Sequence, residues 1–548
     1  MGCASFLPSY SPSPIIFCFI SVITLSSLHV HYCATPIFNA KLNHLLNTRP
    51  HLIPSHTSSS LLYQSRAGRS LNGSQGDGNY AYKTLFYTQT LDHFSFTPSS
   101  YRTFQQRYLV NEDHWGGANS SAPIFVYCGN EGDIEWFASN TGFLWEIAPM
   151  YSAMVVFIEH RYYGESIPDI AQSNHSTETL GYLTSEQALA DYAALIRDFK
   201  RNLSAEDCPV VAFGGSYGGM LAAWFRLKYP HIVVGALASS APILHFDNEA
   251  PLDGFYRIVS ENFKNVSSEC FETISSSWDA LSAAYTESGA EEKISRLFGF
   301  CRNVSADLSS VQGFLYTAWV YMAMTNYPYP SNFLEPMPGN PVAKACEAMD
   351  ALPPNASILE RIVAGVNIYY NGTGETNCFE FGSDTHGLSL WTWQACTEMV
   401  MPMSSDPENS MFPPYNYSFE STEESCLSAY GVRPRPHWIT LQYGGPNLLT
   451  TLKRFGSNIV FSNGLLDPWS IGGVLTSLSD SIVALVTSKG AHHLDLRAAT
   501  DSDPGWLVEQ RDEEKRHISR WLSTYYADYR SSRRHGAPLS AAFDSCSP

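Results

Sequence analysis

The feature that most constrains the fold of this chain is the stretch VVAFGGSYGGMLAAW, residues 210–224. An apolar run is followed by two glycines, a serine, a tyrosine, two more glycines and then a helical pattern. Gly214, Ser216 and Gly218 fit the G-x-S-x-G nucleophile elbow, in which small neighbours let a strand turn sharply into a helix. A tight packing turn is the alternative, because glycine-rich turns are common. The position between a strand-like run and a helix favours the nucleophile.

From about Tyr82 onward, short apolar runs alternate with helical patterns. Buried strands are indicated by the runs APIFVYCGNEGD, AMVVFIEHRYYGES, CPVVAF and IVVGALASSAP. The segment SEQALADYAALIRDFKRNL has the spacing of an amphipathic helix. Continuous apolar strands that alternate with helices predict a parallel sheet covered on both faces.

Between about Phe246 and Pro434 this alternation gives way to helical periodicity and cysteines. One face of a predicted helix carries apolar residues at three- and four-residue spacing, namely Phe271, Ile274, Trp278, Leu281 and Tyr285. The alternation returns with NIVFSNGLLDPWS and SIVALVTSKGAHHLDL. A last helix is expected from Asp503, with Pro504 in its first turn.

A base and an orienting acid follow two of the later strands. Asp467 comes after the run NIVFS, and His492 and His493 come after SIVALVTS. Each therefore belongs to a loop at the carboxyl edge of the sheet, which is also the edge of Ser216. The chain order serine, aspartate, histidine is that of α/β-hydrolases. A turn-forming Asp-Pro pair and surface histidines are the alternatives, and spacing alone does not separate the two adjacent histidines.

These patterns predict an α/β-hydrolase fold with a mostly parallel sheet and an inserted, mostly helical domain. The catalytic domain is expected over residues 81–245 and 435–530, and the helical insert, which the family resemblance described below implies to be a cap, over residues 246–434. A polar tail is expected over residues 531–548.

The N-terminus is predicted to direct the chain into the secretory pathway. Residues 14–30, PIIFCFISVITLSSLHV, have the length of a signal-peptide core, and small residues near Ala34 suit cleavage. We assign residues 1–34 to a signal peptide, with an uncleaved anchor as the alternative because no Lys or Arg precedes the apolar core. Residues 35–80 are polar and rich in Gly and Ser, as in a propeptide or a disordered linker.

Glycosylation sequons and cysteines support this route. The chain has nine Asn-x-Ser/Thr sequons, at Asn72, Asn119, Asn174, Asn202, Asn265, Asn303, Asn355, Asn371 and Asn416. Six of its twelve cysteines lie between Cys270 and Cys426, as in a disulfide framework formed in an oxidising compartment. Buried, reduced cysteines in a cytosolic enzyme are the alternative. A lysosome, a vacuole or the extracellular space is the expected location.

The net charge of the chain limits the classes of partner that it is expected to bind. The net charge is −19, with 33 Lys and Arg residues and no long basic run. Nucleic acid and anionic membranes are therefore excluded as expected partners. No metal or cofactor is implied, because the histidines and cysteines show no ligand cluster.

Several long motifs carry a resemblance to a known family. The chain contains QTLDHFSF, TFQQRY, YCGNEGDIEWF, EHRYYGES, GGSYGGMLAAWFRLKYP, YPYPSNF, GVRPRPHWI, SNGLLDPWSIGGV and GAHHLDLR. With these motifs it resembles the lysosomal Pro-X carboxypeptidase family, which also contains dipeptidyl peptidases that cleave after proline. GNEGDIEWF, YPYPSNF and GVRPRPHWI are more similar to the carboxypeptidase branch.

The resemblance implies a serine exopeptidase that releases the C-terminal residue after a penultimate proline from short peptides. It implies Ser216 as the nucleophile, Asp467 as the acid and His492, rather than His493, as the base. The N–H of Tyr217, the residue after the nucleophile, is expected to stabilise the oxyanion. The second donor is expected in the CGNEG loop, around Gly129 or Asn130.

Further site residues are expected around this triad. Trp469 is a candidate wall for an apolar S1 pocket, and Met399 and Met403 of the insert are candidates for the same pocket. Plain core packing is the alternative for all three. His493 and Arg497 are expected to lie beside the triad, with a polar pair that anchors the loop as an equal alternative.

The resemblance also implies the disulfide pairings Cys270–Cys346, Cys301–Cys378 and Cys396–Cys426. A further bridge expected in that branch is missing, because Leu252 and Ser404 stand near the positions of its cysteines. Cys128, Cys208 and Cys546 have no assigned partners.

Other functions stay open at this point. A post-proline dipeptidyl aminopeptidase would share the triad and the S1 pocket but would hold a substrate ammonium instead of a carboxylate. A lipase or esterase fits the motifs less well, and a non-catalytic binding protein on a hydrolase scaffold would be expected to lack a triad residue. A homodimer is a candidate assembly.

Overall fold

The computed structural model describes residues 80–168, 177–247, 249–301, 306–380 and 390–535. The predicted signal peptide, almost all of the predicted linker, and Cys546 lie outside the described residues. The sequons at Asn72, Asn174 and Asn303 lie outside them as well.

A single eight-stranded sheet forms the centre of the α/β part, with strand order β1-β2-β4-β3-β5-β6-β7-β8. The pairings of β2 with β1 and β4 are antiparallel, and all the others are parallel. This arrangement is the α/β-hydrolase fold that the sequence predicts. The strands are β1 (Lys83–Thr90), β2 (Thr103–Asn111), β3 (Ile124–Cys128), β4 (Met154–Ile158), β5 (Val210–Gly215), β6 (Gly235–Ser239), β7 (Ile459–Gly464) and β8 (Ile482–Thr487).

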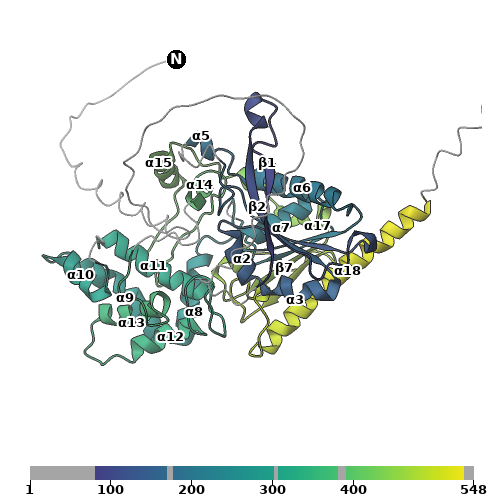
Figure 1. The fold of residues 1–548 in the computed structure, drawn as a ribbon. Coiled ribbons are helices and arrows are strands. Elements are labelled where there is room, and N and C mark those ends of the chain that lie inside the picture. Colours follow the sequence, from purple (N-terminus) through teal and green to yellow (C-terminus); the bar gives the residue numbers. More distant parts are fainter. Residues whose placement is uncertain (1–79, 169–176, 248, 302–305, 381–389, 536–548) are drawn as a thin grey trace, which may run out of the picture.

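Helices cover both faces of this sheet (Figure 1). Apolar residues of α6 and α7 pack on one face, and those of α3 and α18 pack on the other. Every residue of β3, β4 and β5 is buried, which explains why these strands are continuous apolar runs. The helices of this part are α2 (Ile134–Asn140), α3 (Gly142–Tyr151), α5 (Thr177–Leu180), α6 (Ser185–Asn202), α7 (Tyr217–Lys228), α16 (Trp438–Tyr443), α17 (Leu448–Phe455) and α18 (Gly505–His535).

Two details of the α/β part differ from the predictions. The antiparallel β1–β2 hairpin was not predicted as a pair of strands, because β1 is mostly half-buried and lacks a continuous apolar run. The last helix begins at Gly505, directly after Pro504, and not at Asp503. It continues to His535, into the segment that was predicted to be a polar tail.

The first helices of the long connection between β6 and β7 form a lobe beside the sheet, and the later ones, α14 and α15, lie near α5 (Figure 1). This lobe has an apolar core of its own, built around residues such as Phe255, Trp319 and Met349. The predicted face of Ile274, Trp278 and Leu281 points into that core. The helices of the insert are α8 (Gly254–Val266), α9 (Ser268–Ala284), α10 (Ala290–Phe298), α11 (Leu308–Met324), α12 (Pro341–Asp350), α13 (Ile358–Tyr370), α14 (Trp391–Ala395) and α15 (Phe419–Tyr430).

The three disulfide bonds of the insert confirm the predicted pairings, which are Cys270–Cys346, Cys301–Cys378 and Cys396–Cys426. Cys128 and Cys208 are buried and unpaired.

The two positions of the missing fourth bridge lie side by side. The Ser404 N–H donates a hydrogen bond to the Leu252 carbonyl oxygen at 2.7 Å. Both halves of the bridge are therefore replaced at one place, and a backbone hydrogen bond holds the two segments together there.

Six predicted glycosylation sites fall on described residues. Five of these asparagines are exposed and Asn371 is half-buried, so their positions suit the attachment of a glycan. The exposed ones are Asn119, Asn202, Asn265, Asn355 and Asn416.

Candidate active site

The turn from β5 into α7 places Ser216 in a strained backbone conformation. Ser216 has φ 58° and ψ −127°, outside the regions that L-residues prefer. A Cβ atom on Gly214 would lie 2.0 Å from the Gly218 carbonyl oxygen, and one on Gly218 would lie 2.2 Å from Asn130 Oδ1. Glycines are therefore required at both positions. This is the geometry of a nucleophile elbow.

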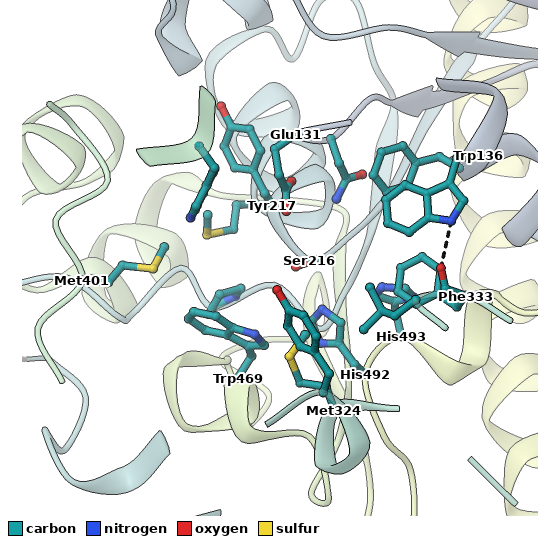
Figure 2. A pocket seen from close by; sticks show the side chains of 17 residues that line it. Glu131, Trp136, Ser216, Tyr217, Met324, Phe333, Met401, Trp469, His492 and His493 are labelled. Atoms are coloured by element: carbon teal, nitrogen blue, oxygen red, sulfur yellow. Dashed lines mark hydrogen bonds between the residues drawn. The ribbon is translucent and has the colours of Figure 1, made fainter. Parts of the chain in front are cut away.

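The acid and the base come from the loops after β7 and β8. Asp467 is fully buried, and its Oδ2 lies 2.8 Å from Nδ1 of His492. Its other oxygen, Oδ1, accepts the backbone N–H of Trp469 at 3.0 Å, at the start of the 3₁₀ helix η5 (Pro468–Gly472). The structure thus pairs Asp467 with His492 and not with His493. Ser216 and His492 line the same pocket (Figure 2).

The insert holds the backbone of His492 from both sides. The His492 N–H donates to the Met324 carbonyl oxygen at 2.9 Å, and the His492 carbonyl oxygen accepts the Tyr327 hydroxyl at 2.8 Å. Met324 is the last residue of α11. The position of this imidazole therefore depends on the insert as well as on the sheet.

The pocket around Ser216 is formed jointly by the sheet edge and the insert. Its walls are mainly aromatic and aliphatic side chains, with polar groups gathered near Ser216, and no Lys or Arg is among them. The lining residues are Asn130, Glu131, Trp136, Phe137, Ser216, Tyr217, Met220, Pro242, Tyr321, Met324, Phe333, Leu334, Trp391, Met401, Trp469, His492 and His493. Apolar walls with a few convergent polar groups are typical of a small-ligand site.

Of the three predicted apolar lining residues, only Trp469 lies in the pocket wall. The prediction for Met399 and Met403 is wrong, and the lining methionine from this segment is Met401. Met399 is buried in the core of the α/β part, and Met403 is buried in the core of the insert. Met401, halfway between them, packs against both cores, so it alone of the three faces the cavity between them.

The loop after β3 carries the two candidates for the second oxyanion donor, Gly129 and Asn130. The prediction for Gly129 is wrong, because its N–H already donates to the Ile158 carbonyl oxygen at 3.0 Å. Asn130 lines the pocket, and its side chain ties this loop to the elbow by donating to the Gly215 carbonyl oxygen at 2.6 Å. Tyr217 is the first residue of α7, so its N–H has no acceptor within the helix.

His493 and Arg497 both contact the Phe333 ring. The His493 ring packs edge-on against Phe333 at a centroid distance of 5.0 Å, and the Arg497 guanidinium lies 5.3 Å from the centroid of that ring. His493 lines the pocket, whereas Arg497 is fully buried outside it. Burial, with help from the neighbouring His492 and Arg497, lowers the pKa of His493 well below its ordinary value. His493 is therefore a neutral imidazole.

Glu131 is a pocket residue that sequence reasoning missed. It follows Asn130 and directs its carboxyl group into the space near Ser216 (Figure 2). Burial raises the pKa of this carboxyl, and the nearby His492 lowers it by a smaller amount. Its place next to Asn130 in the CGNEG loop was the one signal that could have identified it.

A pair of buried carboxyl groups lies behind the loop that carries the base. Asp495 Oδ1 accepts the Ser239 hydroxyl at 2.5 Å, and Glu514 Oε1 accepts the Ser462 hydroxyl at 2.7 Å. A hydrogen bond joins the two carboxyl groups to each other, which requires that one of them carries a proton. Burial and the neighbouring carboxylate raise the pKa of Glu514 well above its ordinary value, as expected for two acids that share one proton.

This pair contributes stability that is lost as the pH rises. A carboxyl whose pKa is raised in the folded state stabilises that state fully below the unfolded pKa, and this contribution is lost as the pH passes the folded pKa. Glu514→Gln keeps a neutral group in place and removes this loss. Between pH 5 and pH 7.5 its melting temperature should therefore fall less, or rise more, than that of the unmodified protein, by about 2–4 °C.

The matched control is Glu509→Gln, on an exposed position of the same helix, whose melting curve should follow that of the unmodified protein at both pH values. An equal change in the Glu514→Gln and unmodified proteins would show that the pair does not set this pH dependence.

An α/β-hydrolase sheet, a serine on a nucleophile elbow, and an Asp–His pair at the same sheet edge define a hydrolase of the serine type. The chain belongs to the family described as Serine carboxypeptidase S28, whose sequence profile matches residues 89–514. It is a serine-type carboxypeptidase.

Individual relatives match most of the chain. Lysosomal Pro-X carboxypeptidase of Homo sapiens is 44% identical over 453 residues, which cover 81% of this chain and 89% of that protein. The protein of the same name from Mus musculus is 43% identical over 455 residues, which cover 82% and 90%. A prolyl carboxy peptidase like protein 5 from Caenorhabditis elegans is 37% identical and covers 81% and 91%.

A solved acetylester hydrolase from Corynebacterium glutamicum is 12% identical and covers 79% of this chain and 94% of its own, with a TM-score of 0.38, which is too distant to inform the reaction. Within the described part of the chain, no helix is both long and apolar enough to cross a membrane.

Proposed function

We propose that this protein releases the C-terminal residue of short peptides whose penultimate residue is proline. The observation that carries the proposal is the Asp467–His492 pair beside Ser216 in an aromatic-walled pocket. The names of the relatives at 43% and 44% identity support the specificity for a Pro-X bond.

In the proposed reaction, His492 removes the proton of the Ser216 hydroxyl as its oxygen attacks the scissile carbonyl carbon. Asp467 holds the Nδ1–H of the imidazole and stabilises the imidazolium that forms. His492 then protonates the leaving amine, and the C–N bond breaks to give an acyl-enzyme. Water, activated by the same imidazole, attacks this ester and restores Ser216.

The N–H groups of Tyr217 and Asn130 are the proposed donors to the oxyanion. Tyr217 begins α7, so the positive end of the helix dipole adds to its N–H. Asn130 lines the pocket from the loop on the opposite side. Donors that are fixed before the reaction stabilise the charge that develops on the carbonyl oxygen.

Trp469 and Met401 are the proposed walls of the proline pocket. The indole of Trp469 is held edge-on by Phe255 at a centroid distance of 4.8 Å and by His245 at 5.7 Å. Its flat face suits a proline ring, and the flexible thioether of Met401 suits the irregular edge of such a ring.

The proposal also covers the cellular location of the protein and its division into domains. We place the mature protein in the lysosome, a vacuole or the extracellular space, with residues 1–34 as its signal peptide. The lysosomal relatives, the exposed sequons and the disulfide bonds support this route. Residues 81–245 and 435–530 form the proposed catalytic domain, and residues 246–434 the proposed cap. A homodimer stays a prediction.

Two matched peptides test the proposed specificity. One peptide has a blocked N-terminus, a penultimate proline and a free C-terminus, and the other has a free N-terminus, proline second and a blocked C-terminus. We expect cleavage of the first peptide alone at acid pH. The second is included because the Glu131 carboxylate, when ionised, would suit a substrate ammonium.

Cleavage of the second peptide alone would replace the proposal with a dipeptidyl aminopeptidase. Cleavage of neither by the folded protein would contradict both specificities.

A further inference from the structure

The hydroxyl of Tyr217 lies in a buried chain of hydrogen bonds that joins the α/β part to the insert. Gln394, on α14 of the insert, is fully buried, and its Nε2 lies 3.0 Å from the Tyr217 hydroxyl oxygen. Its Oε1 accepts the hydroxyl of Tyr163 at 2.6 Å. His160 Nε2 lies 3.0 Å from the same Tyr217 oxygen. The residue after the nucleophile is therefore held by one side chain from each part.

The direction of each of these hydrogen bonds follows from the chemistry of the partners. His160 Nδ1 lies 2.7 Å from the Arg161 carbonyl oxygen, which only accepts, so Nδ1 carries the proton. Burial lowers the pKa of His160 to about 4, so above that pH its Nε2 is a bare acceptor. The Tyr217 hydroxyl therefore donates to His160. Its oxygen is left to accept a hydrogen bond, and Gln394 supplies the N–H.

A second contact fixes the orientation of the Gln394 amide. Its Nε2 also donates to Glu398 Oε1 at 3.2 Å. Glu398 is itself anchored to the start of α6, because it accepts the backbone N–H of Ser185 at 2.8 Å and the Ser185 hydroxyl at 2.9 Å. A flipped amide would place its oxygen against the Tyr217 oxygen, whose one proton is already donated to His160. Gln394 is thus held in one orientation.

We propose that Gln394 is a positioning residue for the reaction: by holding the Tyr217 side chain, it fixes the N-terminus of α7 and the oxyanion donor there. This inference rests on the proposed roles of Ser216 and Tyr217. Ser216 has a strained backbone, and such a conformation persists only where its surroundings hold it. The Tyr217 ring also packs edge-on against Trp391 of the insert, at a centroid distance of 5.1 Å. Docking of α14 therefore completes the oxyanion site.

The test compares Gln394→Met with Tyr217→Phe and with the double variant on a Pro-X peptide. Gln394→Met keeps the length of the side chain and removes its donors and its acceptor. We expect kcat to fall about tenfold to hundredfold in Gln394→Met, with KM changed by less than about threefold, because the lost interaction acts in the transition state. The double variant should be no slower than the slower single variant, because both changes break the same hydrogen bond.

Tyr370→Phe, inside the insert and outside the pocket lining, is the matched control. It removes the hydrogen bond from the Tyr370 hydroxyl to the Phe314 carbonyl oxygen, 2.9 Å long, and keeps the stacking of this ring on Phe314. Its kcat should stay within about twofold of the unmodified protein, even where its melting temperature falls.

The outcomes separate this inference from the proposed function. A Gln394→Met protein with unchanged kcat, or losses that multiply in the double variant, would overturn the inference while leaving the proposed function intact. If the unmodified protein cleaves no Pro-X peptide, the proposed function fails. The same comparison is then made with the rate of Ser216 phosphonylation by a small fluorophosphonate, which uses the same oxyanion donors.

Discussion

Replacing Ser216 with alanine should lower kcat for the Pro-X peptide by about 10⁵–10⁶-fold, the loss expected when a serine nucleophile is removed. The change removes one oxygen atom from a side chain that lies at the mouth of a pocket, so the fold should be unaffected. The remaining rate comes from binding and oxyanion stabilisation without a covalent intermediate. Steady-state kinetics and labelling with a fluorophosphonate measure the two consequences.

Ser260→Ala is the matched control for this change. Ser260 is a buried serine of the insert whose hydroxyl donates to the Tyr256 carbonyl oxygen at 2.7 Å, so its loss should lower the melting temperature and leave kcat almost unchanged. If Ser216→Ala keeps more than about a thousandth of the activity and is still labelled, a different residue is the nucleophile.

Asp467→Asn should lower kcat by about 10⁴-fold, through the tautomer of His492. The Trp469 N–H donates to Oδ1, so in the variant the amide oxygen stays at that position and the NH₂ group faces His492. The amide would donate to Nδ1, and the imidazole proton would move to Nε2. An imidazole with its proton on Nε2 cannot accept the proton of Ser216. KM should change little, because Asp467 is outside the pocket lining.

Asp307→Asn controls for the helix-capping role of an aspartate. Asp307 caps α11 by accepting the Ser310 N–H at 3.0 Å, as Asp467 caps η5, but it lies outside the pocket lining. Its variant should keep the activity of the unmodified protein. An Asp467→Asn protein that retains more than about a tenth of the activity would show that another group orients the base.

The fold of the α/β part and the Asp–His pair could be predicted because their signals are local. A parallel strand that is buried on both faces must be a continuous apolar run, and β3, β4, β5 and β6 are such runs. A nucleophile elbow needs small residues around the serine, and Gly214 and Gly218 meet this need. Asp467 and His492 each follow a strand, so strand order alone brings them to one edge.

Residues whose role depends on contacts between distant segments could not be predicted in this way. Met399, Met401 and Met403 are the same residue type, two positions apart. Which of them faces the pocket depends only on where the core of the α/β part meets the core of the insert. The backbone N–H of Gly129 is bound by the Ile158 carbonyl oxygen of β4, and nothing in the sequence around Gly129 and Asn130 indicates this contact. Gln394 lies 177 positions after Tyr217, its hydrogen-bond partner, and nothing in the sequence near either residue indicates the contact.

The two hydrogen bonds from the insert to the His492 backbone affect when the chain can become active during its synthesis. During synthesis the chain emerges from its N-terminus, so Ser216 comes first, then the segment with Met324 and Tyr327, and Asp467 and His492 last. The elbow and the first six strands can form before the imidazole exists, and the imidazole is held only after α11 is in place. A nascent or truncated chain therefore carries its serine without a seated base. We therefore expect peptidase activity to appear only after the α/β part and the insert have both folded and packed together.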